Sequence, residues 1–367
     1  MWTIRQIFDG DYGCEELAPG QKPKVSVTLV NENGEEKRVS VEDEWLTRQG
    51  LDVGSVWKEY TVPAPLYRDP IYDAPTDPVV IWNHKEKQWW MLYTQRRSAV
   101  NSIGVSHIHG TAIGAASSVD GIRWLYRGTL PGLDFEPGHN TFWAPEVIYA
   151  AGKYHMYVSY ITGVPTDWNW PRHIVHYTAD DLWQWHFESV LKLSSERVID
   201  ACVHPIGNGQ YKMWYKDENH DSYTYSAISN DLYHWEVCGK EIDYNSHEGP
   251  NVFELGGKKW MITDEWNGLG VYETQDYTHW ERQGYILRDG GSRSCDGVMA
   301  SHADVVSKGD IAYIFYFTHP YFTNEHRLDK SYIANAEDGR ACIQAAQLEV
   351  KDGRLVCNRN QQFEMRL

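Results

Sequence analysis

The chain has 367 residues, a length that suits one large domain with a small appendage or two ordinary domains. Its formal net charge of −17 disfavours partners that are themselves anionic, such as nucleic acids and membrane surfaces, whereas a neutral glycan held by hydrogen bonds and stacking is compatible with it. The 17 tryptophans and 24 tyrosines suit either a sheet core or stacking on sugar rings, so their number alone does not separate fold from function.

The start of the sequence shows no basic segment followed by an apolar one, so we expect no secretory leader. No run of roughly 18 apolar residues occurs that would span a bilayer. The cysteines are scattered without a CxxC pair, which argues against a zinc site and indicates reduced thiols in the cytoplasm. They are Cys14, Cys202, Cys238, Cys295, Cys342 and Cys357.

Residues 1–60 predict a small appendage. KVSVTLV and EKRVSV flank Asn33-Gly34, a pair typical of a tight turn in a β-hairpin. Ser40 is the expected N-cap of a short helix over 41–49 that ends at Gly50. This appendage packs on the rest of the chain, forms one rim of a pocket or mediates a homo-oligomer contact, and the sequence leaves these alternatives open.

A repeated pattern occupies residues 61–367. Each copy has a polar, acidic start, an apolar strand, a turn, and then an aromatic-rich strand, as in TDPVVIWNHKEKQWWMLYTQ. The turns carry glycine or charged residues, so each copy predicts a β-hairpin. The five copies begin at Thr76, Trp143, Ile199, His247 and Ser301.

A second hairpin follows four of the copies, where an aspartate in a turn precedes a tryptophan, as in TADDLWQW and SNDLYHWE. The fifth copy, over 334–344, lacks the tryptophan. Two hairpins make one four-stranded blade, so the sequence predicts an all-β fold, a five-bladed β-propeller over 61–367. A plain β-sandwich does not explain the recurrent corner, which we interpret as a fold element without a catalytic role.

Acidic residues stand at the blade starts. The first strand of each blade is expected to line the central channel, so residues at its entry end converge although they are distant in sequence. Desolvating several like charges is costly unless they are used, paired or bound to a cation. The alternative is that each carboxylate bonds strand-edge amides or a structural ion. The candidates are Asp77, Glu146, Asp200, Glu248 and, in the fifth blade, His302 with Asp304.

Hydrolysis of a glycosidic bond needs such a cluster. One carboxylic acid protonates the leaving oxygen, while a carboxylate activates water or attacks the anomeric carbon. Neighbouring like charges push the pKa values of the carboxyl groups apart, which leaves one group protonated near neutrality and another ionised. A third carboxylate can tune the acid and hold it in position.

Four motifs resemble glycoside hydrolase families 43 and 117 and, more distantly, family 32, which belong to one superfamily of five-bladed propellers. They are DPVVI at Asp77, WAPEVIY at Trp143, VIDACV around Asp200 and EGPNVF at Glu248. The resemblance covers roughly 61–350 and leaves the appendage unmatched. It implies that Asp77 is the general base, Asp200 the pKa modulator and Glu248 the general acid. It also implies that an activated water inverts the configuration.

Histidines accompany this set. The resemblance implies that His302 lies near a bound cation, such as calcium, or a water at the axis, and an ordinary hydrogen-bonded histidine is the alternative. No other cofactor is expected. His247 precedes Glu248 and, since family 117 can use a histidine as its acid, is the second candidate for that role. We favour Glu248 because neighbouring strand residues point to opposite sides. His107 and His109 have the spacing of a metal-ligand pair, but a structural pair also explains them.

The second strand of each blade runs back toward the same end, so its last residues are expected beside the carboxylates. Polar side chains there suit hydrogen bonds to sugar hydroxyls, whereas a solvated rim of salt bridges is the alternative. Arg96, Arg97 and Lys216 leave open a substrate that carries a carboxylate or a sulfate. The substrate-binding candidates are Trp143, Glu146, His247, His302, Arg97, Lys216, Glu265 and Trp266.

These features favour an exo-acting, inverting glycosidase that releases a terminal furanose or related sugar from short oligosaccharides. Long loops at 97–111 and 285–300 indicate a closed pocket rather than an open groove. A glycoside phosphorylase, which needs a basic pocket for phosphate, is one alternative. A carbohydrate-binding propeller without activity is the other.

Overall fold

The structure is a computed structural model that describes residues 1–9, 23–57, 61–100, 102–329, 331 and 335–367. The chain divides into two compact units, Met1–Thr61 with Glu364–Arg366, and Val62–Phe363 with Leu367. The cysteines within the described ranges are free thiols, and Cys14 lies outside those ranges. Neither helix of the described chain has the length and apolar character needed to cross a membrane.

The first unit is an antiparallel sheet of order β3-β2-β1-β4 with one short helix. Its elements are β1 (Trp2–Asp9), β2 (Lys24–Asn31), β3 (Glu36–Glu42), α1 (Asp43–Arg48) and β4 (Val56–Trp57). The predicted hairpin is confirmed as β2–β3, with Gly34 at a φ of +79° that favours glycine. The prediction that Ser40 caps the helix was wrong, because Ser40 lies within β3 and Glu42 occupies the N-cap position.

The second unit consists of five sheets, each built from four consecutive antiparallel strands. The first is β5 (Pro75–Asn83), β6 (Gln88–Gln95), β7 (Ile113–Ser118) and β8 (Leu125–Thr129). The second is β9 (Thr141–Ala150), β10 (Lys153–Ile161), β11 (His173–Ala179) and β12 (His186–Val190). The third is β13 (Val198–Gly207), β14 (Gln210–Asp217), β15 (Tyr223–Ser229) and β16 (Glu236–Ile242). The fourth is β17 (Glu248–Leu255), β18 (Lys258–Asp264), β19 (Leu269–Thr274) and β20 (Glu281–Ile286), and the fifth is β21 (Ser301–Lys308), β22 (Ile311–Thr318), β23 (Cys342–Lys351) and β24 (Arg354–Cys357).

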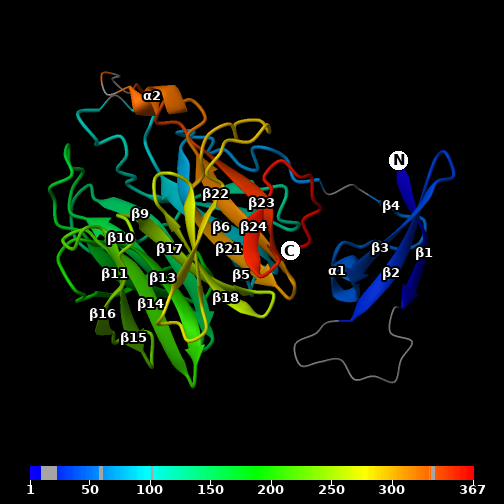
Figure 1. The fold of residues 1–367 in the computed structure, drawn as a ribbon, viewed down its shortest axis with the longest axis horizontal. Coiled ribbons are helices and arrows are strands. Elements are labelled where there is room, and N and C mark those ends of the chain that lie inside the picture. The colour runs from blue at the N-terminus through cyan, green and yellow to red at the C-terminus, as the bar shows by residue number, and fades with distance from the viewer. Residues whose placement is uncertain (10–22, 58–60, 101, 330, 332–334) are drawn as a thin grey trace. The chain divides into compact units, whose positions relative to one another are not determined.

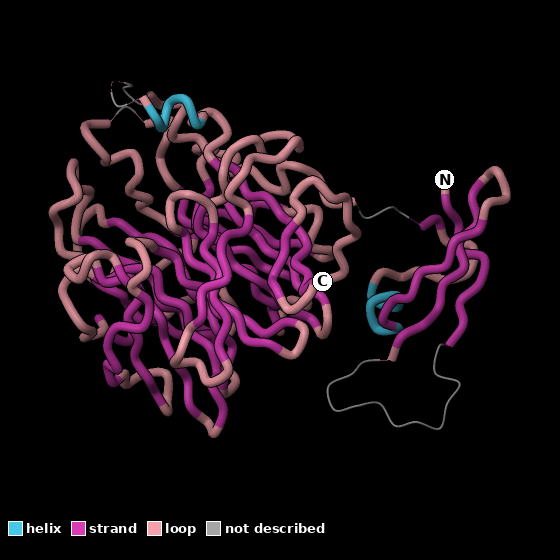
Figure 2. The backbone as a smooth tube through the Cα atoms, viewed as in Figure 1, coloured by secondary structure: helices cyan, strands magenta, loops and turns pink. Residues whose placement is uncertain are grey.

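These sheets are the blades of a propeller. Their first strands contact one another in a closed ring that runs β5, β9, β13, β17, β21 and back to β5, and Figure 1 labels all five of these strands. Strands dominate the unit, and its described helix, α2 (Asn324–Leu328), lies in a connection between β22 and β23 (Figure 2). The predicted five-bladed β-propeller is confirmed.

The segment before β5 closes the ring against the fifth blade. The backbone N–H groups of Leu66 and Tyr67 donate to the Ile343 carbonyl in β23 at 2.9 and 3.2 Å, and the Ile343 N–H donates back to Tyr67 at 2.9 Å. Arg340 Nε donates to Asp73 Oδ2 at 2.7 Å. Each blade therefore keeps its own four strands, and hydrogen bonds from the connecting segment join the last blade to the first.

The recurrent aspartate corners join the third and fourth strands of the first four blades. Asp181 Oδ1 accepts the backbone N–H groups of Trp183 and Gln184 at 3.1 and 2.9 Å, which is an Asx turn. The same pattern recurs at Asp120, Asp231 and Asp276. The fifth blade differs, because its outer hairpin closes at Asp352-Gly353. The prediction of this corner over 334–344 was wrong, and residue 334 lies outside the described ranges.

The hydrophobic core lies between neighbouring blades. One cluster joins Trp90 and Leu92 of β6 to Tyr154 and Val175 of the second blade. Similar clusters join the second blade to the third, the third to the fourth and the fourth to the fifth. The large aromatic side chains of the second strands fill the wedge-shaped spaces between neighbouring sheets. This packing fixes the inner strands relative to one another.

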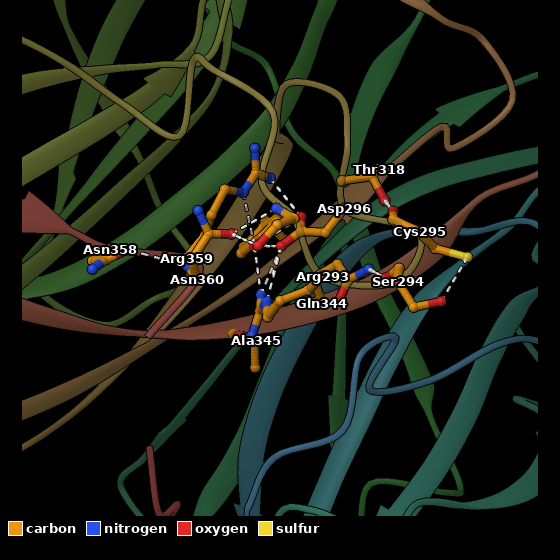
Figure 3. A network of polar contacts seen from close by, with 12 residues as sticks. Arg293, Ser294, Cys295, Asp296, Thr318, Gln344, Ala345, Asn358, Arg359 and Asn360 are labelled. Atoms are coloured by element: carbon orange, nitrogen blue, oxygen red, sulfur yellow. Dashed lines mark hydrogen bonds and ion pairs between the residues drawn. The ribbon is translucent and has the colours of Figure 1, made fainter. Parts of the chain in front are cut away.

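A buried ion-pair network fastens the loop before β21 to the C-terminal segment (Figure 3). Asp296 is fully buried, and its Oδ2 and Oδ1 lie 2.8 Å from Arg293 Nη2 and 2.7 Å from Arg359 Nη2, respectively. The Tyr316 hydroxyl lies 3.0 Å from Asp296 Oδ2. One carboxylate thus balances two arginines in a place that water does not reach, so its loss would leave buried cations without a counter-charge.

We predict that Asp296→Asn lowers the free energy of unfolding of the propeller by about 3 kcal/mol, because breaking one side of a buried ion pair leaves the other side unpaired. Urea denaturation followed by tryptophan fluorescence measures this. Asp310→Asn is the matched control, since Asp310 is exposed in the β21–β22 turn and should change stability by less than about 0.5 kcal/mol. Equal effects of the two substitutions would contradict the network's role.

Candidate active site

A register shift of the kind that a β-bulge produces occurs in the first strand of every blade, and in the fifth blade it falls at His302. In the first four blades the first residue of the bulge has left-handed backbone geometry, with φ of +50° at Asp77 and +58° at Asp200. Aspartate adopts this conformation more readily than most residues do. Ala144 and Gly249 hold the same place in β9 and β17, with φ of +44° and +55°, and Glu248 directly precedes Gly249. Bulges re-aim side chains, and here they occur at the entry end of every one of these inner strands.

A cavity of about 630 Å³ lies at this end of the propeller, within the size range of small-ligand sites. Asp77, Asp200 and Glu248 come from the first, third and fourth blades, and all three line it. Trp143 and Lys216, together with Trp266, line it as well. The structure therefore brings the three predicted catalytic residues together. Other lining residues with charged or aromatic side chains include Arg96, Trp168, Arg172, Arg197, Asp264 and Arg327.

The imidazole of His302 lies between two of the carboxylates. Its Nδ1 is 3.7 Å from Asp77 Oδ1 and 3.8 Å from Asp200 Oδ2. The His302 backbone N–H donates to Asp264 Oδ2 at 2.9 Å. Burial lowers the pKa of His302, but the surrounding carboxylates, Asp200 foremost, outweigh burial and raise the pKa above its ordinary value. The carboxylates around His302 therefore favour its charged form, which offsets negative charge at the axis.

Glu248 has two polar partners at the cavity wall. Lys216 Nζ lies 3.0 Å from Glu248 Oε2, and the Trp266 indole Nε1 donates to Oε1 at 3.0 Å. Burial alone raises the pKa of Glu248, but the charge and hydrogen bond of Lys216 and the hydrogen bond of Trp266 outweigh it, so the pKa falls below its ordinary value. Glu248 is therefore ionised in the free cavity at neutral pH.

Two neighbouring carboxyl groups show the opposite shift. Burial raises the pKa of Asp200 to about 7, with repulsion from Glu248 and Asp77 opposing the attraction of His302. Burial and the charge of Glu248 raise the pKa of Asp264 to about 7. Asp200 Oδ2 also accepts the Gly249 N–H at 3.1 Å. Protonated and ionised carboxyls thus stand side by side near neutrality, which is the arrangement that acid–base chemistry requires.

Three cationic side chains contact the carboxylate of Glu218 at the wall of the cavity. Its carboxylate lies 3.3 Å from Lys216 Nζ, 3.3 Å from Arg172 Nη1 and 3.0 Å from Arg197 Nη2. Arg197 also donates to the backbone carbonyl of Trp168 at 2.8 Å, and Arg172 donates to the same oxygen. The two arginines therefore hold the Trp168 loop in place, and their charge is largely used within the protein.

Five of the eight predicted binding residues do not line the cavity, namely Arg97, Glu146, His247, Glu265 and His302. The guanidinium of Arg97 donates to two backbone carbonyls of its own loop at 3.0 and 2.8 Å. Glu265 Oε2 lies 2.9 Å from Arg282 Nη2 in a separate polar cluster. His247 is fully buried, its Nε2 lies 2.6 Å from the Thr224 hydroxyl, and burial lowers its pKa. His247 thus lies apart from the substrate space, as its opposite strand face predicts.

Glu146 lies two residues beyond the bulge residue of β9, so it is not equivalent to Asp77 and does not line the cavity. Its Oε1 accepts the Val203 N–H at 2.7 Å. Nearby, Asn251 Nδ2 donates to Asp304 Oδ1 at 3.0 Å. Burial and the charge of Asp304 raise the pKa of Glu146 well above its ordinary value. The carboxyls of Glu146 and Asp304 thus link neighbouring inner strands through hydrogen bonds. This is the alternative role that the sequence left open for carboxylates at the blade starts.

The described residues contain no group of three or more histidine, cysteine, aspartate or glutamate side chains arranged to hold a metal ion. An axial calcium ion does not fit the donor set, because the His302 imidazole stands between the carboxylates that would supply oxygen ligands. His109 packs against Trp143 with the rings tilted and their centroids 4.6 Å apart, and its Nδ1 lies 3.1 Å from the Thr141 hydroxyl. His107 lines the cavity.

The charged and aromatic lining residues that escaped prediction include Trp168, Arg172, Arg197 and Arg327. Arg172 and Arg197 directly precede β11 and β13, Trp168 lies in the connection before β11, and Arg327 belongs to α2. All four lie outside the first two strands of the blades, where the repeat pattern carries no information. Charge placed directly before a predicted strand is the only signal that could have singled out the two arginines.

Solved structures with the same fold include a thermostable family 43 glycoside hydrolase, with 17% sequence identity over 82% of this chain and 99% of that chain and a TM-score of 0.57. An α-L-arabinofuranosidase from Lactobacillus brevis has 13% identity over 83% and 99% of the two chains and a TM-score of 0.59. A family 43 β-1,3-galactosidase has 12% identity over 82% and 100%, with a TM-score of 0.59. No protein-family model matches the chain, and no curated protein matches its sequence. The resemblance to family 43 is confirmed at the level of the fold.

We predict that His302 titrates above the ordinary histidine pKa of about 6.5, because the carboxylates around it stabilise its charged form. A histidine NMR titration measures this, with His302→Gln used to assign the resonance. Asp200→Asn removes the largest attractive charge, so it should lower the titration midpoint of His302. An unchanged midpoint in Asp200→Asn would contradict the ion pairing.

Proposed function

We propose that this protein is a glycoside hydrolase that removes a terminal sugar from short oligosaccharides with inversion of configuration. The convergence of Asp77, Asp200 and Glu248 on one cavity carries this proposal, because glycosidic hydrolysis needs an acid and a base on two sides of one sugar. The fold adds support, since its neighbours are named as a β-xylosidase, an α-L-arabinofuranosidase and a β-1,3-galactosidase. A furanose or a related small sugar suits a cavity of about 630 Å³.

In this proposal Asp77 is the general base. The Thr76 hydroxyl donates to Asp77 Oδ2 at 2.9 Å, and Arg96 Nη2 lies 3.8 Å from the same oxygen. These contacts orient the carboxylate, while His302 flanks its other oxygen. The Asp77 carboxylate removes a proton from water as the water attacks the anomeric carbon. The bond to the leaving oxygen breaks on the other face of the ring.

Glu248 is the general acid that protonates the leaving oxygen. It shares its proton with Asp200, because the two carboxyls interact and titrate as a pair. In the free cavity Lys216 lowers the pKa of Glu248. The proton that the two carboxyls share therefore resides on Asp200 below a pH of about 7. Transfer to Glu248 forms the productive state. Trp266, which donates to Glu248, presents an indole ring that suits stacking on the departing sugar.

A glycoside phosphorylase receives less support. Of the three basic residues that suggested it, Arg97 does not line the cavity, and Lys216 is paired with Glu218 and Glu248. Arg96 does line the cavity, but it lies beside Asp77, the carboxylate that is proposed to activate the nucleophile, and a nucleophilic phosphate would be repelled by that carboxylate. A hydrolase needs only a neutral water molecule at that place.

We predict that Asp77→Asn and Glu248→Gln each lower kcat by at least about a hundredfold while the far-UV spectrum and melting temperature stay close to those of the parent protein. The assay is sugar release from a panel of aryl glycosides and natural disaccharides. Glu281→Gln and Asp310→Asn, both exposed, are the matched controls and should keep full activity. Comparable activity in either cavity variant would remove that residue from its role, and turnover that requires inorganic phosphate would favour the phosphorylase.

We predict opposite movements of the alkaline limb of the kcat/KM profile in two variants. The acid must be protonated, so activity falls as the pH rises through the pKa of the Asp200–Glu248 pair. Lys216→Met removes a cation that lowers the pKa of Glu248, so the limb should move to higher pH. Asp200→Asn leaves Glu248 with its own low pKa, so the limb should move to lower pH. Movement in the same direction, or none, would contradict the shared proton.

A further inference from the structure

Arginine and lysine side chains line the cavity in two sets that differ in how their charge is balanced. Arg172, Arg197 and Lys216 form one set, and all three contact the carboxylate of Glu218. An internal counter-charge therefore already occupies the space between them. The second set is Arg96 and Arg327. Arg96 has one distant counter-charge, Asp77, whose Oδ2 lies 3.8 Å from Nη2, and Arg327 has none within ion-pair distance among the described residues.

Arg96 lies at the end of β6 with its guanidinium over the ring of Phe317, 5.4 Å from the ring centroid. Its Nε is buried and has no hydrogen-bond partner within the described ranges. The only carboxylate near it is Asp77, whose Oδ2 is 3.8 Å from Nη2, too long for a hydrogen bond. Arg96 thus keeps donors unused although its guanidinium is largely shielded from water.

Arg327 reaches the same cavity from α2. Its guanidinium lies over the Phe322 ring, 4.7 Å from the centroid, and its Nε donates to the Phe322 carbonyl at 3.3 Å. Among the described residues no carboxylate lies within ion-pair distance of it. Burial lowers the pKa of Arg327, and the more distant charge of Asp264 offsets this only in part. Arg327 therefore directs an uncompensated cation toward the ligand space.

His319 connects the two arginines. It lines the cavity, its ring packs edge-on against Phe317 at 5.3 Å, and its Nδ1 lies 2.9 Å from the Arg340 carbonyl. Burial, followed by the charge of Arg96 and that of Arg327, lowers the pKa of His319 to about 3. A histidine offers no negative charge to a guanidinium group, and Arg96, His319 and Arg327 all line the same cavity.

We propose that Arg96 and Arg327 form a binding site for an anionic substituent, a carboxylate or a sulfate ester, on the terminal sugar. This rests on the hydrolase function proposed above and names its substrate class as acidic glycosides. Paired planar guanidinium groups match the oxygen geometry of both anions. A hydroxyl group would satisfy the donors but not the charge, whereas an anion satisfies both.

The substituent belongs to the sugar that is released rather than to the leaving group. Arg96 stands beside Asp77, the proposed base, which acts on the face of the anomeric carbon away from the leaving oxygen. Glu248 and Trp266 are the residues that would contact the leaving group. The cation beside them is Lys216 rather than Arg96 or Arg327. The acidic substituent is thus bound at the end of the cavity that holds the terminal sugar.

The test measures the binding of free sugars to the full-length protein by calorimetry. The probes are matched pairs, galacturonate with galactose, glucuronate with glucose, and galactose 6-sulfate with galactose. At least one anionic member should bind about tenfold or more tightly than its neutral parent, the usual value of one charge-assisted contact. Uronates and sulfates form separate arms, so the preferred member tells which anion the site takes.

Variants assign the preference to the arginine. Arg327→Gln should abolish the preference for the anionic sugar and leave the affinity for the neutral parent within about threefold, whereas Arg327→Lys should retain part of the preference. Arg197→Gln is the matched control, since Arg197 lines the same cavity but is paired with Glu218, and it should keep the preference. Equal losses for the neutral and anionic sugars in Arg327→Gln would overturn the proposal.

The outcomes separate this inference from the proposed function. Hydrolysis of neutral glycosides without any preference for anionic sugars overturns the anion site and leaves the hydrolase standing. Binding of an anionic sugar that depends on Arg327, without turnover of any glycoside, supports the site and overturns the hydrolase. Equally tight binding of inorganic phosphate, with turnover that requires it, overturns both.

Discussion

Charge balance at the end of the propeller channel is the constraint on which the candidate site depends. Asp77, Asp200, Asp264 and Glu248 occupy one region that is largely closed to water, where like charges repel strongly. The Lys216 ammonium and His302, whose pKa the carboxylates raise, offset part of that repulsion. The remainder is relieved by protonation, which is why the pKa values of Asp200 and Asp264 rise while that of Glu248 falls. A set of similar side chains thereby acquires different protonation states.

The fold creates this crowding through its inner strands. The closed ring of first strands fixes five chain segments around one axis, and the register shifts in these strands turn the chain at its entry end. At Asp77 and Asp200 the backbone is left-handed, a conformation that costs of order 1–3 kcal/mol in a residue other than glycine. Packing between blades holds these positions in place, so the stability of the wedges supports the geometry of the site.

The sequence predicted the residues that recur at the same position in each blade, and few of the residues that lie outside the repeat. Asp77, Asp200 and Glu248 were found because each stands at a blade start, and hairpin register then places the ends of the second strands, including Lys216 and Trp266, beside them. Glu146 was misplaced by two residues because bulge position is a matter of backbone register, and register is not visible in a strand's composition.

Residues that the repeat does not encode were out of reach for a different reason. Arg327 and Trp168 lie in connections between strands, whose conformation depends on tertiary contacts. Ser40 was expected to cap a helix, but pairing with β2 extends β3 past it, so a sheet contact overrode a local capping preference. His247 could be set apart from Glu248 by strand alternation alone. The exact partners of each carboxylate, which decide its protonation, required the coordinates.

A crystal structure of the Glu248→Gln variant with a bound oligosaccharide tests the central claim most directly. The account predicts one sugar ring at the channel end, with its glycosidic oxygen within hydrogen-bond distance of residue 248 and its anomeric carbon facing Asp77 across a single water molecule. A ligand bound away from the channel end, or one whose anomeric carbon faces neither carboxylate, would contradict it.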